Sequence, residues 1–374
     1  MEARGLAAAT EREQLTITIL LLAGAALLVL GAELLVRGAT LIAAAAGIRP
    51  LIIGLTVVAF GTSAPELAVS LGATFGGEPD IAVGNVVGSN IFNVLFILGL
   101  SALIVPLAVQ RQVIRFELPI MLGVSILLLV VAYDGIIGRL DGLLLFGGLL
   151  AYLFYLARSG GAPVPATAIT AATEDSAIRG PGGARRIAIA ALLALLGLVL
   201  LVAGSRFFVN GAVGLAVLLG VSQTVIGLTI IAAGTSLPEL ATSVLAGIRG
   251  ERDIAVGNVV GSNIFNILAI LGLCGLLAPD GVGVNPAILR FDIPVMIAVA
   301  VATLPVFFTG FRIGRLEGLL FLAFYTAYTA FLVLQATQHD ALEAFSGGML
   351  MFVLPLTAIG LALSVLQARR RRER

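Results

Sequence analysis

The sequence predicts an all-α polytopic membrane protein, built as an inverted-topology repeat of five plus five transmembrane helices with one further C-terminal helix. Three observations predict this fold class. The chain of 374 residues is 59% hydrophobic and only 11% charged, whereas soluble domains are about one-quarter charged. Apolar runs of about 20 residues, long enough to cross a bilayer, recur along the chain. A segment of the first half also returns, nearly unchanged, in the second half.

Apolar runs define the predicted spans in chain order. The first set lies at 15–46, 51–77, 81–105, 117–133 and 140–157. The second set lies at 187–219, 223–248, 254–278, 292–309 and 316–336, and a last run lies at 345–367. The stretch between the sets is rich in Gly, Pro and Ala and lacks periodicity, which is typical of a linker. We therefore expect a first repeat at 15–157, a linker at 158–186, an inverted second repeat at 187–336 and an accessory helix at 345–367.

The internal repeat is the most specific feature of the sequence. DIAVGNVVGSNIFNVLFILGL at 80–100 returns as DIAVGNVVGSNIFNILAILGL at 253–273. IIGLTVVAFGTSAPEL at 52–67 matches VIGLTIIAAGTSLPEL at 225–240 with the same offset. Because each copy has an odd number of spans, the second copy enters the membrane from the opposite face. Such inverted repeats are typical of secondary transporters that switch access around a site at the membrane midplane.

The arginines predict the orientation, because basic loops favour the cytoplasmic side of a membrane. All 22 basic residues of the chain are arginines. With the N-terminus outside, the inner loops and the C-terminal tail hold most of them, including Arg49, Arg249 and Arg312, while the outer segments hold few. We expect a multi-pass protein of the cell membrane, with the N-terminus outside and the linker and C-terminus in the cytoplasm.

The composition excludes several classes of function. The chain has no lysine, one histidine and one cysteine, which excludes a phosphate-binding loop, a multi-histidine metal centre and a disulfide framework. A net charge of +1 leaves no footprint for nucleic acid. An intramembrane hydrolase using Ser63 or Ser236 lacks an activating base. We expect no enzyme, no cofactor and no required protein partner; the partners predicted are transported cations and membrane lipid.

Two glutamates, Glu66 and Glu239, lie near the middle of apolar spans in the repeated pattern G-T-S-x-P-E. A charge at the bilayer centre costs roughly 2.5–3.5 kcal/mol, so such residues mark function. Pro65 and Pro238 lack an N–H group, so each breaks its helix and frees a carbonyl about one turn earlier. A desolvated cation satisfies such carbonyls directly.

Hydroxyl and amide side chains surround the two glutamates in the sequence. The candidate ligands beside the helix breaks and in the second motif are Thr62, Ser63, Thr235, Ser236, Ser89, Asn93, Ser262 and Asn266. Ser89 and Asn93 are four residues apart and therefore share a helix face. Asn90 lies off that face, and its role as an interhelical hydrogen bonder or as a ligand stays open.

The candidate ligands are all oxygen atoms, which disfavours softer metals. Ca²⁺ takes six to eight oxygens in flexible geometry, and Na⁺ could use subsets of the same atoms. The two carboxylates give a charge of −2, which one Ca²⁺ or two monovalent ions balance. An empty site would leave two buried charges unpaired, so exchange of cations is the natural activity.

Other acidic residues and several glycines have structural interpretations. Glu33 favours a pairing or interface role, because its equivalent in the second copy is Arg206. Glu117 and Asp292 lie near span ends beside arginines, which predicts anchoring ion pairs with Arg115 and Arg290. The glycines at 84, 88, 257 and 261 are spaced to let helices approach closely.

These motifs resemble the two alpha repeats of the cation/calcium exchanger superfamily, in particular those of prokaryotic sodium/calcium exchangers. The motifs that carry the resemblance are G-T-S-A-P-E and G-T-S-L-P-E, each followed by G-N-V-V-G-S-N-I-F-N. The resemblance spans about 15–336. It implies a ten-helix inverted-repeat core, antiport of Ca²⁺ against Na⁺, and first spans that slide across the rest to alternate access.

The resemblance also implies roles for single residues. Glu66 and Glu239 would be the central carboxylates, and Thr62 and Thr235 would bind Ca²⁺ through their backbone carbonyls. The flanking Na⁺ sites would use Ser63, Ser236, Ser89 and Ser262 with the carbonyls of Ala59 and Ala232, and Asn93 and Asn266 would complete the middle.

One departure concerns the counter-ion. Some sodium/calcium exchangers have an aspartate at one of the last two positions, whereas this chain has Asn93 and Asn266. An amide does not titrate or carry charge. An alternative is therefore exchange of Ca²⁺ for H⁺, with Glu66 and Glu239 carrying the protons; a passive cation channel lined by the same oxygens is a second alternative.

Overall fold

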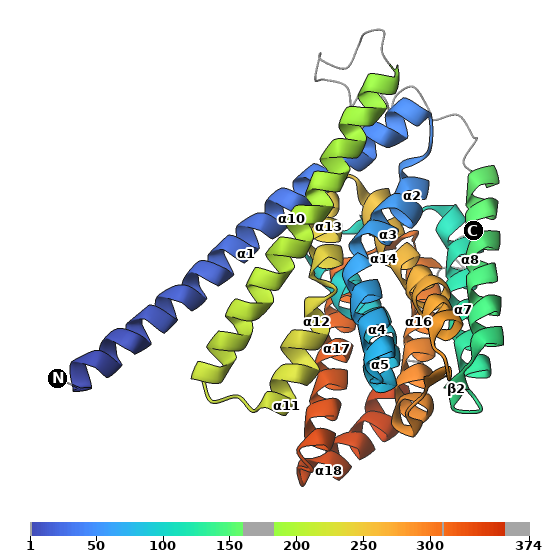
Figure 1. The fold of residues 1–374 in the computed structure, drawn as a ribbon. Coiled ribbons are helices and arrows are strands. Elements are labelled where there is room, and N and C mark those ends of the chain that lie inside the picture. The colour runs from blue at the N-terminus through green and yellow to red at the C-terminus, as the bar shows by residue number, and fades with distance from the viewer. Residues whose placement is uncertain (1, 160–182, 309, 356–374) are drawn as a thin grey trace.

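The structure is a computed structural model that describes residues 2–159, 183–308 and 310–355. Nearly all of this part of the chain is helical (Figure 1). The first half contains α1 (Glu2–Ala46), α2 (Pro50–Ile53), η1 (Gly54–Val58), α3 (Ala59–Thr62), α4 (Ala64–Gly76), α5 (Pro79–Phe92), η2 (Asn93–Leu98), α6 (Gly99–Ile104), η3 (Val113–Glu117), α7 (Leu118–Val131) and α8 (Arg139–Ser159). Elements named η are π-helical.

The second half repeats this order. It contains α10 (Gly183–Leu218), α11 (Gln223–Ile226), η5 (Gly227–Ile231), α12 (Ala232–Gly234), α13 (Leu237–Ile248), α14 (Arg252–Phe265), η6 (Asn266–Leu271), α15 (Gly272–Leu277), η7 (Ile288–Asp292), α16 (Ile293–Phe308) and α17 (Arg315–Ala336), followed by α18 (Ala341–Gly348) and η8 (Met349–Val353). The all-helical membrane fold that the sequence predicts is thus confirmed.

The predicted spans correspond closely to observed helices, with two exceptions. Eight helices of the described part are long and apolar enough to cross a membrane, and the pair 50–62 and 64–76, bent by 44°, makes a ninth. The span expected at 223–248 is divided into α11, η5, α12 and α13. The last expected span, 345–367, lies partly outside the described residues, so the count of ten spans plus one stays a prediction.

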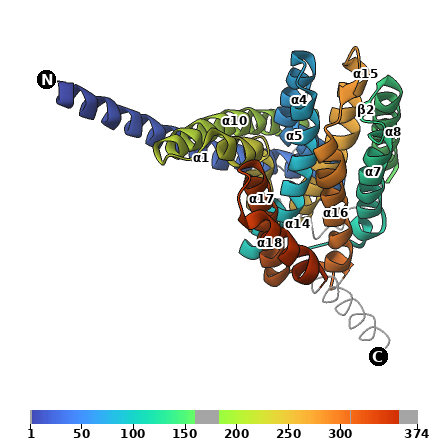
Figure 2. The same cartoon turned by 90° about the horizontal axis from the view of Figure 1, so that it is seen from below.

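The long helices α1 and α10 lie side by side and extend from the rest of the bundle (Figures 1 and 2). Glycines seven residues apart line their contact, at 24, 31 and 38 on α1 and at 197, 204 and 211 on α10. A Cβ on Gly197 would lie 2.5 Å from the backbone nitrogen of Leu35. No larger residue fits there, so these glycines allow the two backbones to touch.

Two short antiparallel ladders join the repeats. In one, β1 (Leu107–Ala108) pairs with β4 (Arg312–Ile313), and in the other, β2 (Ile136–Ile137) pairs with β3 (Val282–Gly283). Each ladder takes one strand from each half of the chain. The centre of the bundle is formed by α5 and α14, and nearly every residue of α14 is buried. These two helices carry the second repeated motif.

Candidate ion-binding site

Each glutamate of the repeated G-T-S-x-P-E pattern lies in the first turn of a broken helix. Glu66 is in the first turn of α4, and Glu239 is in the first turn of α13. The breaks occur at Ser63 and Ser236, where the ψ angles are 7° and 8°. Both carboxylates are fully buried, and the positive ends of the helix dipoles favour negative charge there. The breaks expected from the prolines are therefore present.

The two copies exchange hydrogen bonds across the site. The Ser63 hydroxyl donates to Oε1 of Glu239 at 2.8 Å, and the Ser236 hydroxyl donates to Oε1 of Glu66 at 2.8 Å. Ser89 Oγ lies 3.1 Å from Ser236 Oγ. The glutamate of each copy is thus held by the serine of the other, so one site is built from both repeats.

One oxygen of each glutamate has no hydrogen-bond partner within the described residues. These atoms are Oε2 of Glu66 and Oε2 of Glu239. The Oδ1 atoms of Asn93 and Asn266 are also buried and unpartnered. An unsatisfied buried acceptor costs about 1–3 kcal/mol, and more when it is charged. These oxygens come in pairs related by the repeat.

Four asparagines fix which way the amide oxygens of the second motif point. Asn93 donates its amide nitrogen to Oδ1 of Asn263 at 3.0 Å, and Asn266 donates to Oδ1 of Asn90 at 3.0 Å. Asn90 and Asn263 also donate to each other's backbone carbonyls. Asn90 is therefore an interhelical hydrogen bonder. Because the nitrogens of Asn93 and Asn266 are used, their oxygens remain available as ligands.

Two further asparagines, which sequence reasoning did not single out, position the glutamates. Asn85 donates to the backbone carbonyl of Glu66 at 3.1 Å and accepts from Thr235 at 3.2 Å. Asn258 donates to the carbonyl of Glu239 at 3.4 Å and accepts from Thr62 at 3.1 Å. Their place in the repeated G-N-V-V-G-S motif was the only signal that could have pointed to them.

The predicted ligand residues are brought together with one exception. Those that are buried are Ala59, Thr62, Ser63, Glu66, Ser89, Asn93, Ser236, Glu239, Ser262 and Asn266, while Thr235 is half-buried. The Ser262 hydroxyl lies 3.5 Å from the Ala59 carbonyl oxygen. Ala232, the equivalent of Ala59, is exposed. The structure therefore does not place Ala232 in the buried cluster.

A carbonyl freed by a helix break has a partner on a long helix. Pro238 leaves the carbonyl of Gly234 without its helical donor, and the Ser205 hydroxyl of α10 donates to it at 2.6 Å. The first copy has Ala32 at the position equivalent to Ser205. The long helix α10 is therefore tied to the broken span by a bond that α1 does not make.

The donor set is chemically hard. In the described part of the chain, no group of three or more His, Cys, Asp or Glu side chains is placed to hold a metal. The site instead combines two carboxylates with hydroxyl, amide and backbone oxygens. Such oxygens suit Ca²⁺ and other hard cations.

The ion pairs expected for Glu117 and Asp292 are wrong. Glu117 accepts from Tyr152 at 3.0 Å and from Gln112 at 3.1 Å. Asp292 accepts from Tyr328 at 2.7 Å. A tyrosine hydroxyl on the next span donates to each carboxylate, whereas the neighbouring Arg115 and Arg290 are exposed.

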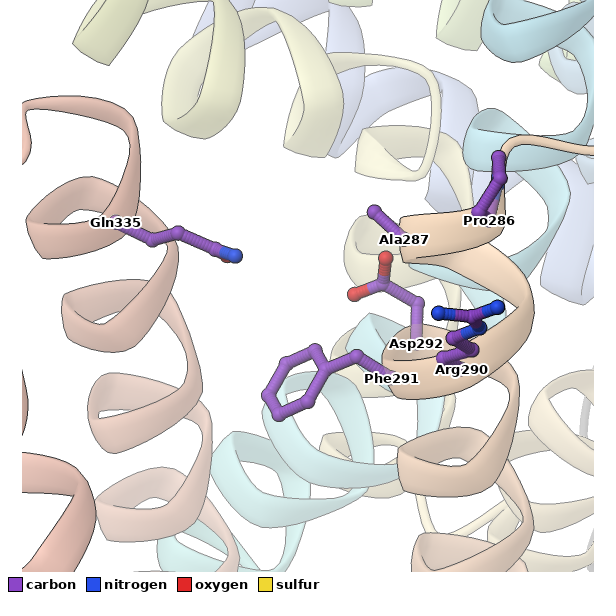
Figure 3. A pocket seen from close by; sticks show the side chains of 6 residues that line it. All are labelled: Pro286, Ala287, Arg290, Phe291, Asp292 and Gln335. Atoms are coloured by element: carbon purple, nitrogen blue, oxygen red, sulfur yellow. The ribbon is translucent and has the colours of Figure 1, made fainter.

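The two carboxylates differ in exposure. Ala287 stands where the first copy has Gln112, and Asp292 faces a cavity of about 300 Å³ that is also lined by Gln335 of α17 (Figure 3). Asp292 is therefore only half-buried, whereas Glu117 is fully buried.

Glu33 takes the pairing role expected for it. Its carboxylate contacts Arg37 on α1 and lies 2.8 Å from Nη2 of Arg249, which directly follows α13. This ion pair joins a long helix to the helix that carries Glu239.

Comparison with known proteins gives a consistent result. The chain matches the family model described as "Sodium/calcium exchanger protein" over residues 16–158 and 189–334. It is 42% identical over 303 residues to "Putative antiporter CaxA" of Alkalimonas amylolytica, an alignment that spans 81% of this chain and 92% of that protein. It is 36% identical to "Sodium/calcium exchanger MaX1" of Methanosarcina acetivorans over 75% of this chain and 88% of that one.

A solved structure also resembles this fold. The sodium-calcium exchanger NCX_Mj, soaked with Na⁺ and Ca²⁺, superposes with a TM-score of 0.70 at 31% identity. The match covers 84% of this chain and 97% of NCX_Mj.

Proposed function

This chain belongs to the sodium/calcium exchanger protein family, a family of antiporters rather than enzymes, and we propose that it exchanges Ca²⁺ for Na⁺ across the cell membrane by alternating access around Glu66 and Glu239. The observation that carries the proposal is the set of four buried, unpartnered oxygens on Glu66, Glu239, Asn93 and Asn266. They lie in a cluster of hydroxyl and amide groups contributed by both repeats.

The charge of the site explains why transport would be coupled. With both carboxylates ionised, the site carries −2, and one Ca²⁺ or two Na⁺ neutralise it. Moving the empty site across the membrane would leave two charges unpaired in a medium of low dielectric constant, which is strongly unfavourable. The protein therefore changes access only when it is loaded, and this makes it an exchanger rather than a leak.

The proposed ligand set follows the repeat. Ca²⁺ takes oxygens of Glu66 and Glu239 with the backbone carbonyls of Thr62 and Thr235. Na⁺ uses the hydroxyls of the four serines and the carbonyls of Ala59 and Ala232, with Asn93 and Asn266 in the middle. Ala232 is exposed in this structure. Its carbonyl would therefore join the other ligands only in a state in which α12 packs more closely on the site.

The proposed topology has two inverted repeats, 15–157 and 187–336, joined by a cytoplasmic linker at 158–186, with the N-terminus outside and the C-terminus inside. The strand pairings support it. The ladder of β1 with β4 joins segments assigned to the inner face, and the ladder of β2 with β3 joins segments assigned to the outer face. An inverted repeat requires this pairing of one loop from each copy.

The test is uptake of radioactive Ca²⁺ into liposomes that contain the purified full chain. We compare an outward Na⁺ gradient, an outward H⁺ gradient and no gradient, for the wild type, Glu66→Gln and Glu117→Gln. Glu117 is the matched control, because it is equally buried but lies outside the site.

We expect uptake that is driven by Na⁺, abolished in Glu66→Gln and retained in Glu117→Gln. Uptake driven only by H⁺ would keep the site and replace the counter-ion. Rapid Ca²⁺ flux without a gradient would overturn the exchanger in favour of a channel.

A further inference from the structure

A surface groove lies along the contact between α1 and α13. It has a volume of about 570 Å³ and is lined by Ala25, Ala26, Val29, Leu30, Glu33, Leu245 and Arg249. Val29 is 61% exposed and Leu30 is 50% exposed. Apart from its two charged residues, the groove is apolar.

The charges lie together at one end of the groove. Glu33 is only 16% exposed, whereas the side chains of Arg37 and Arg249 are 62% and 53% exposed. Two guanidinium groups thus lie against one carboxylate, and both arginine side chains are more than half exposed. Arg249 uses Nε and Nη2 on Glu33, so some of its five N–H donors still face outward, where they can bind a phosphate.

The apolar lining runs from this charged end toward the membrane interior. Arg249 follows the last residue of α13, at the boundary of the span, and Leu245 lies one turn deeper on the same helix face. On α1, the lining residues precede Glu33 at helical spacing, so they also lie deeper. The distance along α1 from Ala25 to Glu33 is ~12 Å, from a rise of about 1.5 Å per residue. This matches the upper part of an acyl chain.

We propose that the groove binds a phospholipid with an anionic headgroup, its phosphate on Arg249 and Arg37 and one acyl chain between α1 and α13. The two exposed arginines decide the headgroup, because basic side chains at the membrane boundary attract anionic lipids. The lipid would link the long helix to the helix of Glu239.

The other repeat does not offer an equivalent site. In the other repeat, the larger Leu198 and Val199 are equivalent to Ala25 and Ala26. Gly76 is equivalent to Arg249, so that repeat has no arginine at this position. The Leu198 side chain already fills space beside Gly61, where a Cβ would lie 2.6 Å from it. The proposed site is therefore single and confined to one side of the molecule.

The test uses the full chain in nanodiscs of equimolar dioleoyl phosphatidylglycerol and dioleoyl phosphatidylcholine. After release into detergent, native mass spectrometry counts the lipids that remain bound. This readout does not depend on transport, so it can fail independently of the proposed exchange activity. Arg312→Gln is the matched control, because Arg312 is an exposed arginine of β4 that does not line the groove.

We expect the wild type to retain phosphatidylglycerol in preference to phosphatidylcholine. Arg249→Gln should weaken retention about fivefold, as expected for one arginine at a lipid surface, and Ala26→Leu should abolish it by filling the groove. Glu33→Gln should strengthen retention, because it frees both guanidinium groups. Equal retention in Arg249→Gln, Ala26→Leu and Arg312→Gln, or no preference in the wild type, would overturn the proposal.

Discussion

The two repeats carry nearly the same motifs but pack differently on the two sides of the ion site. On the tight side, α2 and η1 lie on α14. A Cβ added to Gly257 would lie 2.9 Å from the carbonyl oxygen of Leu51, and one added to Gly261 would lie 2.8 Å from that of Leu55. On the loose side, where α12 contacts α5, the equivalent Gly84 has its nearest neighbour at 3.7 Å, and Gly88 has none within 4 Å in the described residues.

The helices that carry the glutamates show the same difference. α1 packs along α13, and Thr242 of α13 is buried, whereas its equivalent on α4, Val69, is 39% exposed. In the loop after α13, the Glu251 carboxyl is half-buried beside Asp253. Desolvation, and to a lesser extent the negative charge of Asp253, raises the pKa of Glu251. The equivalent Glu78 on the loose side is exposed.

One sequence motif is therefore compatible with two packings. Since the motif segments of the two repeats are nearly identical, we expect the packing seen on the tight side to be available to the loose side as well. We therefore expect a second state in which α5 and α4 become the tight partners and α14 and α13 become loose. Exchange of the two packings would move access from one face of the membrane to the other.

The largest expected effect tests whether the two sides contribute equally to the ion. Glu66 is on the loose side and Glu239 on the tight side, yet each has one unpartnered oxygen. Glu66→Gln and Glu239→Gln should therefore both reduce Na⁺-driven Ca²⁺ uptake to background, because either change removes a charge that the cation needs. Uptake in either variant near the wild-type rate would show that the site belongs to one repeat alone.

The positioning asparagines should give the next largest effect. Asn85→Ala and Asn258→Ala each remove the bond to a glutamate backbone and the bond to a threonine of the other copy. We expect Ca²⁺ affinity to fall about 10- to 100-fold, as for other residues that orient metal ligands. Equilibrium binding of radioactive Ca²⁺ measures this. Asn210→Ala, at an exposed position of α10, should leave affinity unchanged, and a comparable loss there would remove the assignment.

The glycines allow the two packings to be shifted in opposite directions. Gly261→Ala should disfavour the observed state, because its Cβ meets backbone, while Gly88→Ala should disfavour only the exchanged state. Thiol labelling of Thr242→Cys in a Cys274→Ser background reports exposure of the tight side.

Overpacking typically costs about 1–3 kcal/mol, so labelling should rise about tenfold in Gly261→Ala. It should not rise in Gly88→Ala, whose exchange rate should nevertheless fall. Equal labelling in the two variants would contradict the two-state interpretation.

The smallest expected effect concerns the ion pair of Glu33 with Arg249, which only the tight side has. Arg249→Gln removes a bond between α1 and α13, so labelling of Thr242→Cys should increase about two- to fivefold. The effect is modest because half-exposed ion pairs contribute little. Arg312→Gln provides the control, and a decrease in labelling would show that the pair does not hold the tight side together.

Much of the fold was predictable, because the length of the apolar runs and the near-identical repeated motifs can be read directly from the sequence. The two glutamates were predictable for a related reason, since a buried charge has few explanations in a membrane. The roles of Asn85 and Asn258 were not, because each joins a glutamate backbone of its own repeat to a threonine of the other repeat. The asymmetry was not predictable either: identical motifs give no signal that one copy packs tightly while the other does not. The tyrosine partners of Glu117 and Asp292 were missed because they lie a whole span away in the chain.

We expect Ca²⁺ and Na⁺ to compete for one site that is built from both repeats. Isothermal titration of Ca²⁺ into the purified chain at increasing Na⁺ concentrations tests it most directly. We predict one Ca²⁺ per chain, an apparent affinity that falls as Na⁺ rises, and no binding in the variant that combines Glu66→Gln with Glu239→Gln. Ca²⁺ binding that ignores Na⁺, or that persists in the double variant, would contradict the account.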